Sequence, residues 1–456
     1  MDTHTIAAIA TPSAPAGLGV IRLSGEDAIC IASRVFRPLS SAKSLCDLAG
    51  YTALYGHVFD ESGDIDDCVA LVFRAPHSYT GENVVELSCH GGLYLLQRVL
   101  RAVLSAGAKP AGPGEFTRRA FVNGKLDLTG AEAVMELISA GGRLAAKTAL
   151  AAREGAVFRR LQQVKETLLG VSAQFTAFID YPDDDIPELL PQTLSHTLSD
   201  CVTTMQNLLS TFDAGKILRE GIDTVIVGSP NVGKSTLMNL LAGCERSIVT
   251  PIAGTTRDVV EETVRLGDVV LRLADTAGIR STEDVVENIG VERARSRMLS
   301  AALVLVMFDG SVPLTDADRK LAEEASQTTS IAIINKADLQ QNIDSEYINS
   351  RFKQIVSISA QSGDGLQSLT EAVAAVTGIE NLSESEPLLA TERQRDCAAR
   401  CLQALDEAAD ALTMGVTLDA VAVSIDGAIN AILELTGERA TEAVVNEVFA
   451  RFCVGK

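Results

Sequence analysis

The stretch Gly-Ser-Pro-Asn-Val-Gly-Lys-Ser at residues 228–235 constrains the fold of this chain more than any other feature. Such a loop binds phosphate when a strand leads into it and a helix follows, because backbone N–H groups and the helix N-terminus then surround the phosphate oxygens. The β-branched residues 224–227 predict that strand, and helical spacing follows the loop. The stretch therefore predicts an α/β domain that binds a nucleoside phosphate.

Strand-forming segments recur after this loop and alternate with helical spacing. They lie at residues 269–273, 303–308, 331–334 and 355–358. This alternation is typical of a parallel sheet flanked by helices. Further motifs directly follow three of these segments, so the sequence predicts one nucleotide site built from several strand ends.

The phosphate side of this site has two motifs. Lys234 would bridge the β- and γ-phosphates, and Ser235 would bind Mg²⁺. Asp275-Thr276-Ala277-Gly278 follows the second predicted strand, where Asp275 could hold Mg²⁺ through water and the Gly278 N–H could sense the γ-phosphate.

The base side identifies guanine. In Asn335-Lys336-Ala337-Asp338, the Asp338 carboxylate can accept both the N1–H and the exocyclic amine of guanine, donors that adenine cannot offer together. Asn335 would brace the loop and the stem of Lys336 would lie on the base. Ser359-Ala360 would direct a backbone N–H toward the guanine oxygen. These motifs, in this order, predict a GTPase.

The residue after Gly278 is Ile279, where Ras-like proteins carry the glutamine that positions the attacking water. An aliphatic side chain cannot orient water. The acidic residues Glu283, Asp284 and Glu287 are the nearby candidates, although an ordinary solvated surface is the other interpretation of such charges.

The flanking regions differ from the α/β domain. Residues 20–23, 68–73 and 84–89 predict strands, residues 93–104 a helix, and Thr129 with Glu132 a capping box that begins a further helix. Helical spacing dominates up to residue 218 and again after Pro387. We expect a multidomain α/β protein with a Ras-like P-loop G domain inserted into an α-helical domain. The predicted boundaries are 1–120 for an α+β domain, 121–218 for the first helical part, 219–380 for the G domain and 381–456 for the second helical part.

Composition narrows the class further. The 456 residues include 39 Lys and Arg and 60 Asp and Glu, which gives a net charge of −21. This charge argues against a protein that coats nucleic acid by neutralising its phosphates. The nine cysteines are dispersed without a Cys-x-x-Cys pair, so we expect reduced thiols and a cytoplasmic location. No targeting segment is evident, and the longest apolar run, residues 301–308, is too short to span a membrane.

Four features together resemble the MnmE (TrmE) family of tRNA-modification GTPases. They are the loop Gly-x-Pro-Asn-x-Gly-Lys-Ser, the segment Ile252-Ala253-Gly254-Thr255-Thr256-Arg257-Asp258, Ile279, and Cys453-Val454-Gly455-Lys456. Era and EngA GTPases share the G-domain motifs, whereas the Cys-x-Gly-Lys ending combined with the inserted G domain is more specific. The resemblance covers the whole chain and implies an N-terminal tetrahydrofolate-binding domain.

The resemblance implies a set of ligands in the G domain. Asn231, Thr250, Ile252 and Thr255 would coordinate K⁺ in the position of an arginine finger, and Thr256 would join Ser235 on Mg²⁺. Glu287 matches the general base of the family, beside Lys234 as a catalytic cation. The full implied GTP-binding set is Asn231, Val232, Gly233, Lys234, Ser235, Thr236, Thr250, Pro251, Ile252, Ala253, Gly254, Thr255, Thr256, Asp275, Thr276, Ala277, Gly278, Asn335, Lys336, Asp338, Ser359 and Ala360.

The resemblance also implies a second site and partners. Arg22, Glu86, Lys125 and Lys456 match folate-contacting positions, and Cys453 would serve the modification chemistry. A homodimer is implied, with an MnmG-like flavoprotein that carries the FAD, and no membrane is involved. The acidic charge balance of this chain indicates that the partner grips most of the tRNA. Together they would place an aminomethyl or carboxymethylaminomethyl group on carbon five of the wobble uridine, using a one-carbon unit from a tetrahydrofolate derivative.

Two other functions stay open at this point. One is a ribosome-assembly GTPase like Era or EngA, and the other is a folate-dependent aminomethyltransferase with a regulatory G domain. For several conspicuous residues a structural role is the preferred interpretation: Cys397 and Cys401 as core thiols, His90 as part of a turn, and Arg118-Arg119 and Arg159-Arg160 as solvated charges rather than RNA contacts.

Overall fold

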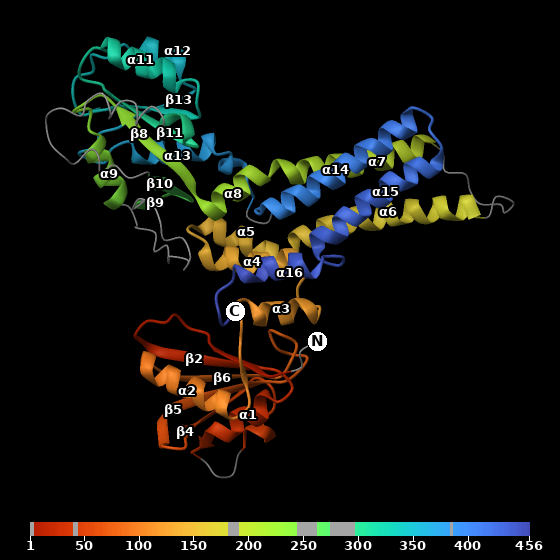
Figure 1. Cartoon of the computed structure of the whole chain (residues 1–456). Helices are drawn as coiled ribbons and strands as arrows, with labels where there is room; N and C mark the ends of the chain where they lie inside the picture. The colour runs from red at the N-terminus through yellow and green to blue at the C-terminus, as the bar shows by residue number, and fades with distance from the viewer. Residues whose placement is uncertain (1–3, 40–43, 181–190, 244–261, 274–296, 384–385) are drawn as a thin grey trace. The chain divides into compact units, whose positions relative to one another are not determined.

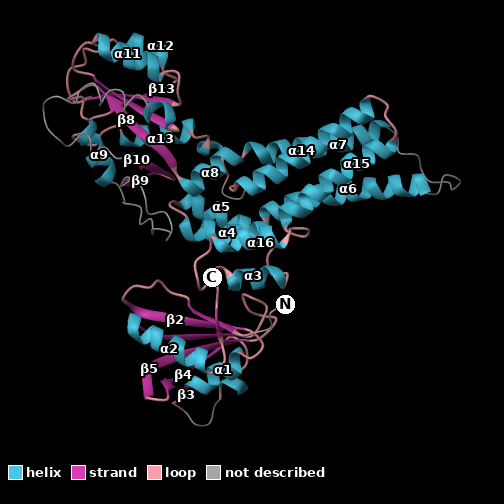
Figure 2. Cartoon of the chain, in the orientation of Figure 1, coloured by secondary structure: helices cyan, strands magenta, loops and turns pink. Residues whose placement is uncertain are grey.

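The computed structural model describes residues 4–39, 44–180, 191–243, 262–273, 297–383 and 386–456 (Figure 1). These residues divide into two compact units. The first comprises residues 1–135 and 429–456, and the second comprises residues 136–428. Sheet and helix occur in both units, as Figure 2 shows by colour. The multidomain α/β class expected from the sequence is confirmed.

The first unit is built on a seven-stranded sheet with the strand order β3-β4-β5-β6-β2-β1-β7. Neighbouring strands are antiparallel except for β1 and β7, which are parallel. The strands are β1 (Ile6–Ile9), β2 (Ala16–Ser24), β3 (Phe36–Pro38), β4 (Thr52–Asp60), β5 (Gly63–Phe73), β6 (Val84–Gly91) and β7 (Lys109–Pro110). The sequence predicted β2, β5 and β6 but missed the others.

Helices cover one face of this sheet. Helix α2 (Leu93–Ser105) buries Leu96, Val99 and Val103, which recur at helical spacing on one side, against the sheet beside α1 (Ala28–Val35). The one-turn helix η1 (Leu45–Asp47) adds Leu45 to the same core. The alternation of buried and exposed residues along β5 is what a sheet with one covered face requires.

The remaining helices of the first unit form a smaller core. Helix α16 (Glu442–Ala450) packs against α3 (Glu115–Val122), and its Val448 and Phe449 join Leu128 and Val134 of α4 (Leu128–Ser139). The predicted capping box at Thr129 is wrong. Helix α4 begins at Leu128, and the Asp127 carboxylate accepts hydrogen bonds from the backbone N–H groups of Thr129 (2.8 Å) and Gly130 (3.1 Å).

The second unit contains the inserted α/β sheet, with six strands in the order β13-β12-β11-β8-β10-β9. All neighbours are parallel except β9 and β10. The strands are β8 (Ile222–Gly228), β9 (Glu262–Leu266), β10 (Val269–Leu273), β11 (Leu303–Asp309), β12 (Ser330–Asn335) and β13 (Gln354–Ser357). The sequence missed the antiparallel β9 and predicted the other five.

Helices cover both faces of this sheet. They include α9 (Lys234–Gly243), α11 (Asp316–Ala325), α12 (Ser345–Arg351), α13 (Leu366–Val376) and the short η2 (Ile379–Asn381). Strand β11 is buried on both sides, since Leu303 and Leu305 join one hydrophobic core and Val304 and Val306 join another. This explains why its sequence is continuously apolar rather than alternating.

The helical part of the second unit brings together chain segments from both sides of the insertion. It consists of α5 (Arg143–Arg153), α6 (Ala156–Asp180), α7 (Pro191–Ser210), α8 (Phe212–Glu220), α14 (Glu392–Thr413) and α15 (Leu418–Thr436), with α4 and α15 contributing residues to both units. Helix α14 packs along α7 (Figure 1), and Leu389 N donates to Thr211 Oγ1 at 3.1 Å. The expected insertion of the G domain into a helical domain is confirmed, while the exact boundaries stay a prediction.

Among the helices that the described ranges contain, none has the combination of length and apolar character that crossing a bilayer demands.

Candidate functional site

The phosphate loop connects the end of β8 to the first residue of α9. Asn231 and Gly233 have φ angles of 65° and 102°, and asparagine and glycine adopt such left-handed conformations more readily than other residues. Lys234 Nζ donates to the carbonyl oxygens of Gly228 (2.7 Å) and Ser229 (2.8 Å). Burial lowers the pKa of Lys234 below its ordinary value. The loop thus places a desolvated ammonium at a helix N-terminus, the arrangement that suits phosphate oxygens.

The residues around Lys234 have distinct positions. Val232 is buried in the hydrophobic core beside the sheet and so anchors the loop. Ser235 and Thr236 lie exposed in the first turn of α9, so their hydroxyl oxygens are accessible to a ligand or cation.

The base-side loop is tied directly to the phosphate loop. Asn335, the last residue of β12, is buried and donates from Nδ2 to Val232 O at 2.7 Å, while its Oδ1 accepts the N–H of Ala360 at 2.9 Å. Gly233 lies so close that a Cβ there would be 2.2 Å from Asn335 Nδ2. Three motifs that are far apart in sequence therefore meet through one amide side chain.

The other residues of the base side lie near Asn335 in sequence or in the sheet. Lys336 has a φ of 63° and its ammonium pairs with the Asp309 carboxylate, while Asp338 is exposed. Burial raises the pKa of Asp309, but hydrogen bonds from Lys336 and Ser311 outweigh it, so this pKa lies below its ordinary value. Ser359 is buried next to Ala360.

Asp309 was missed by sequence reasoning. It ends β11 and is the register partner of Asn335 in the neighbouring strand. Its position at the end of a predicted strand was the available signal, and its role in holding Lys336 required the pairing of β11 with β12.

Several residues of the expected GTP site lie outside the described residues. They are Thr250, Pro251, Ile252, Ala253, Gly254, Thr255, Thr256, Asp275, Thr276, Ala277, Gly278 and Glu287, together with Ile279, Glu283 and Asp284.

A second group of predicted residues lies in the first unit. Arg22 on β2 and Glu86 on β6 are register partners, and Arg22 Nε donates to Glu86 Oε1 at 2.8 Å. Their side chains are 19% and 23% exposed, so the pair is accessible but largely desolvated. The Arg22 guanidinium also lies 5.8 Å from the centre of the Phe116 ring. The Lys125 side chain packs near Gly81, where an added Cβ would lie 3.6 Å from it.

Residues 453–456, here called the tail, are docked onto the same unit. Gly114 N donates to Cys453 O at 3.3 Å, and Phe116 N donates to Lys456 O at 3.2 Å. Arg22 Nη1 donates to Gly455 O at 3.4 Å. The structure therefore brings the tail, Arg22 and Glu86 together, although Arg22 and Gly455 are 433 residues apart in the chain.

Gly455 determines how the tail lies. Its φ is 97°, and a Cβ at this position would be 2.5 Å from Ile9 O. A glycine is required because the tail both turns and passes close to the backbone of β1. Two residues before Gly455, the Cys453 thiol is exposed.

Cys397 and Cys401 differ from the exposed Cys453. Cys397 and Cys401 are buried in α14, and burial raises the pKa of Cys401 to about 12, so this thiol stays protonated. No group of three or more potential metal ligands occurs within the described ranges. The structural interpretation of these two cysteines agrees with their burial.

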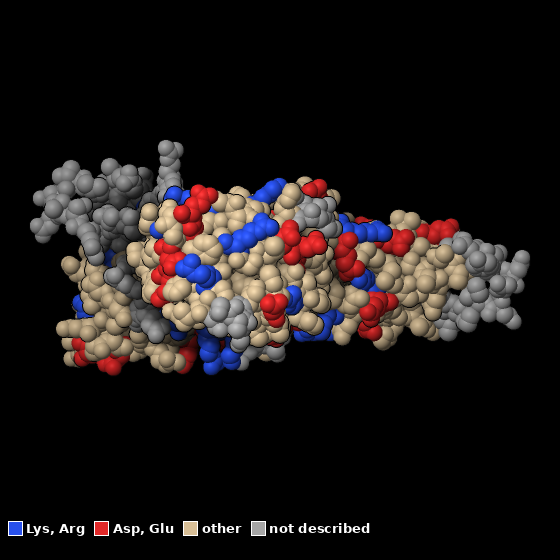
Figure 3. Space-filling model, turned by 90° about the horizontal axis from the view of Figure 1, so that it is seen from below, with Lys and Arg blue, Asp and Glu red and all other residues tan. Residues whose placement is uncertain are grey.

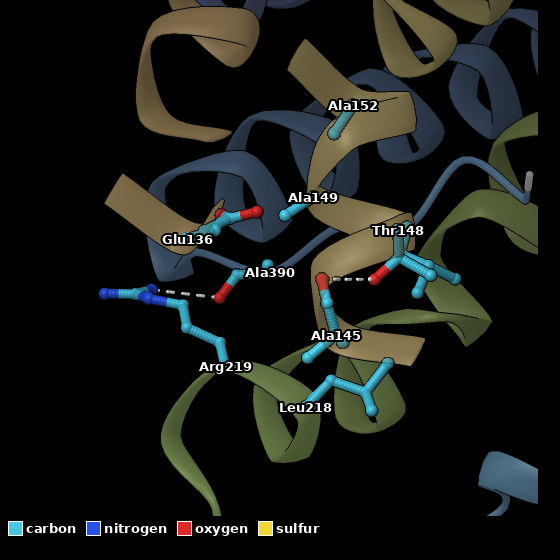
Figure 4. A pocket seen from close by; sticks show the side chains of 10 residues that line it. Glu136, Ala145, Thr148, Ala149, Ala152, Leu218, Arg219 and Ala390 are labelled. Carbon is cyan, nitrogen blue, oxygen red and sulfur yellow. Dashed lines mark hydrogen bonds between the residues drawn. The ribbon is translucent and has the colours of Figure 1, made fainter. Parts of the chain in front are cut away.

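One pocket lies in the helical part of the second unit, between α5, α8 and residues 388–390 (Figure 4). Two of its polar side chains donate hydrogen bonds to backbone carbonyl groups. Thr148 Oγ1 donates to Leu144 O at 3.0 Å, and Arg219 Nη1 donates to Ala390 O at 3.0 Å. We therefore assign no ligand to it.

A phosphate loop joined to an Asn-Lys-x-Asp loop at the carboxyl ends of parallel strands defines a P-loop protein of the GTPase class. The family model described as "MnmE helical domain" matches residues 128–453, and the one described as "GTP-binding protein TrmE N-terminus" matches residues 5–125. The chain belongs to the MnmE (TrmE) family of tRNA modification GTPases, as the sequence resemblance indicated.

Relatives that carry this name span the whole chain. The tRNA modification GTPase MnmE of Symbiobacterium thermophilum is 41% identical over 460 residues, covering 100% of both chains. That of Lactococcus lactis subsp. lactis is 40% identical over 457 residues, covering 100% of this chain and 99% of its own.

Solved structures match a smaller part. Aquifex aeolicus Era bound to GDP and AlF₄⁻ is 26% identical with a TM-score of 0.26, covering 40% of this chain and 66% of its own. The G domain of the T. maritima FeoB iron transporter is 23% identical with a TM-score of 0.26, covering 34% of this chain and 98% of its own.

Proposed function

We propose that this GTPase depends on K⁺ and, with an MnmG-like flavoprotein, modifies carbon five of the wobble uridine of certain tRNAs in the cytoplasm. A tetrahydrofolate derivative would supply the one-carbon unit of the aminomethyl or carboxymethylaminomethyl group. FAD would be carried by the partner, and the chain itself would form homodimers.

The observation that carries this proposal is the docked tail. It places the exposed Cys453 thiol in the same unit as Arg22 and Glu86, and the Arg22 guanidinium contacts the tail backbone directly. Arg22, Glu86, Lys125 and Lys456 offer charged groups suited to the carboxylates and ring N–H groups of a folate.

The nucleotide site would act mainly through positioning and charge. Lys234 would neutralise the β- and γ-phosphates, and Asp338 would select guanine from its exposed position. Ser235 offers an accessible hydroxyl oxygen, the donor type that Mg²⁺ prefers, and Asn231 offers a side-chain oxygen suited to K⁺. When bound there, such cations stabilise the charge that develops between the β- and γ-phosphates.

The surface charge supports assigning most of the tRNA contact to the partner. On the face drawn in Figure 3, Lys and Arg side chains are interspersed with Asp and Glu. A net charge of −21 gives the whole chain an unfavourable field for RNA phosphates.

The direct test compares wobble nucleosides of total tRNA from cells with and without the gene. Loss of the carbon-five modification without the gene, restored by the full-length chain, is expected. Unchanged nucleosides would contradict the proposal and favour a role in ribosome assembly.

The K⁺ assignment has its own test. GTP turnover should be much faster in K⁺ than in Na⁺, because the smaller ion fits a site built around Asn231 poorly. Equal rates in the two salts would remove K⁺ from the proposal.

The general base is tested by Glu287→Ala. This variant should lose hydrolysis while binding GTP nearly as well as the native chain, because Ile279 cannot position the attacking water. Retained turnover would place the base elsewhere.

A further inference from the structure

The first turn of α11 contacts the phosphate loop through Asp318. Ser229 Oγ donates to Asp318 Oδ1 at 2.5 Å, although the two residues are 89 positions apart. Asp318 is 8% exposed, whereas most aspartates lie at the surface. A buried carboxylate is costly unless its oxygens are bonded, so its partners indicate what it stabilises.

The two carboxylate oxygens of Asp318 have separate partners. Oδ2 accepts from Thr315 N at 3.0 Å and from Thr315 Oγ1 at 2.7 Å. Since Asp318 N also donates to Thr315 Oγ1 at 3.2 Å, the two residues form a capping box at the start of α11. Oδ1 is directed to Ser229 in the phosphate loop. The helix cap accounts for the hydrogen bonds of Oδ2. Oδ1 is left to join α11 to the phosphate loop.

Ser229 is well placed to transmit this contact. Its carbonyl oxygen accepts one of the two hydrogen bonds that hold the Lys234 ammonium, and its hydroxyl group is held by Asp318. On the opposite side of the loop, Asn335 holds Val232 O at 2.7 Å. The loop is therefore anchored at two points, one from α11 and one from β12.

We propose that Asp318 is a positioning residue for the phosphate loop, acting through Ser229. The contact keeps the loop in a conformation ready for phosphate, so less conformational entropy is lost when the nucleotide binds. Asp318 does not touch the phosphates in this account. The proposal rests on residues 228–235 being the GTP site.

A purely structural role is the competing explanation, since Asp318 caps a helix. The two roles predict different behaviour. A cap affects the stability of α11, whereas a loop anchor affects nucleotide affinity and the KM for GTP more than it affects kcat.

The test uses Ser229→Ala in the full-length chain, with Ser229→Thr as the variant that keeps the hydroxyl group and Thr315→Ala as the matched control for the cap. Fluorescent GDP binding, GTP kinetics and thermal unfolding are measured for each. Ser229→Ala should bind GDP on the order of tenfold more weakly and raise KM with little change in kcat, because one hydrogen bond to a charged group is lost. Ser229→Thr should retain most of the native affinity.

The control separates the two explanations. Thr315→Ala should lower the unfolding temperature but leave GDP affinity near that of the native chain, because the Ser229–Asp318 contact remains. Native GDP affinity in Ser229→Ala would overturn the proposal, as would an equal loss of affinity in Thr315→Ala. If the native chain itself bound no GDP, the GTP site assignment would be wrong instead.

Discussion

The phosphate loop and the docked tail are assembled in contrasting ways. The phosphate loop is a continuous stretch of eight residues, and its Lys234 is held by carbonyls from the same stretch. The tail site combines Arg22, Glu86, Phe116 and Gly455, which come from opposite ends of the chain. The conformation of the phosphate loop depends mainly on its own residues. The tail site, by contrast, forms only when the first unit has folded around the tail.

The two sites also differ in what stabilises them. In the nucleotide site, Asn335 links motifs at the ends of parallel strands, so the sheet itself sets their spacing. In the tail site, long-range backbone hydrogen bonds from Gly114 and Phe116 hold a segment of only four residues at the chain end. The tail should therefore be the more easily disrupted of the two, and each site should fail without disturbing the other.

The largest effect is expected for Lys234→Ala. Removing the ammonium should lower kcat/KM for GTP by about 10²–10³-fold, because a preorganised charge at the phosphates is lost. Phosphate release assays measure this, with the exposed Lys353→Ala as a matched control. The reactivity of the Cys453 thiol should be unchanged, and a tail that becomes disordered in Lys234→Ala would break the separation of the two sites.

A large effect on the other site is expected for Gly455→Ala. The added Cβ meets Ile9 O and the backbone must hold a strained positive φ, so the docked tail should be destabilised enough to lower modification by about tenfold. Nucleoside analysis measures modification, and Val454→Ala, an exposed neighbour, serves as the control. Full modification by Gly455→Ala would show that docking is dispensable.

A moderate effect is expected for Arg22→Ala. It removes the pair with Glu86 and the contact with Gly455 O, so the free energy of unfolding of the first unit should fall by about 1–2 kcal/mol. Denaturant unfolding measures this loss. Arg37→Ala, which removes the exposed pair with Asp64, should cost less than about 1 kcal/mol. Equal losses of unfolding free energy in the two variants would mean that the Arg22 contacts contribute no more than an exposed ion pair.

The smallest effect concerns protons at the phosphate loop. Burial lowers the pKa of Lys234 in the free protein, and bound phosphates should raise it again. Between these two pKa values, GTP binding should take up a fraction of a proton, so affinity should fall as pH rises through this alkaline window. Calorimetry in buffers of different ionisation enthalpy measures the uptake. No uptake in the native chain, or the same uptake in Lys234→Ala, would assign the proton elsewhere.

The contrast between the sites also explains what could be predicted from the sequence. Segments rich in β-branched and apolar residues, alternating with helical spacing, predicted β8, β10, β11, β12 and β13, and the motifs at their ends identified the guanine nucleotide. The antiparallel β9 was missed because three of its five residues, Glu262, Thr263 and Arg265, are polar. Asp309, Ser229 and Asp318 were missed because their roles depend on which elements are neighbours, and periodicity does not specify this.

The second site could not be derived from local pattern. Arg22 and Glu86 were identified through family resemblance, and their pairing became evident only from the register of β2 and β6. Thr129 was misassigned as a cap because the helix already begins at Leu128 and the Asp127 carboxylate accepts hydrogen bonds from its first backbone N–H groups.

The central claim is that one chain holds a GTP site and a separate tail site, both needed for tRNA modification. Cys453→Ser tests it most directly, with GTP hydrolysis and wobble nucleosides measured on the same variant. The account predicts native GTP turnover together with loss of the modification, because the exposed thiol belongs to the tail site alone. Full modification by Cys453→Ser would contradict it.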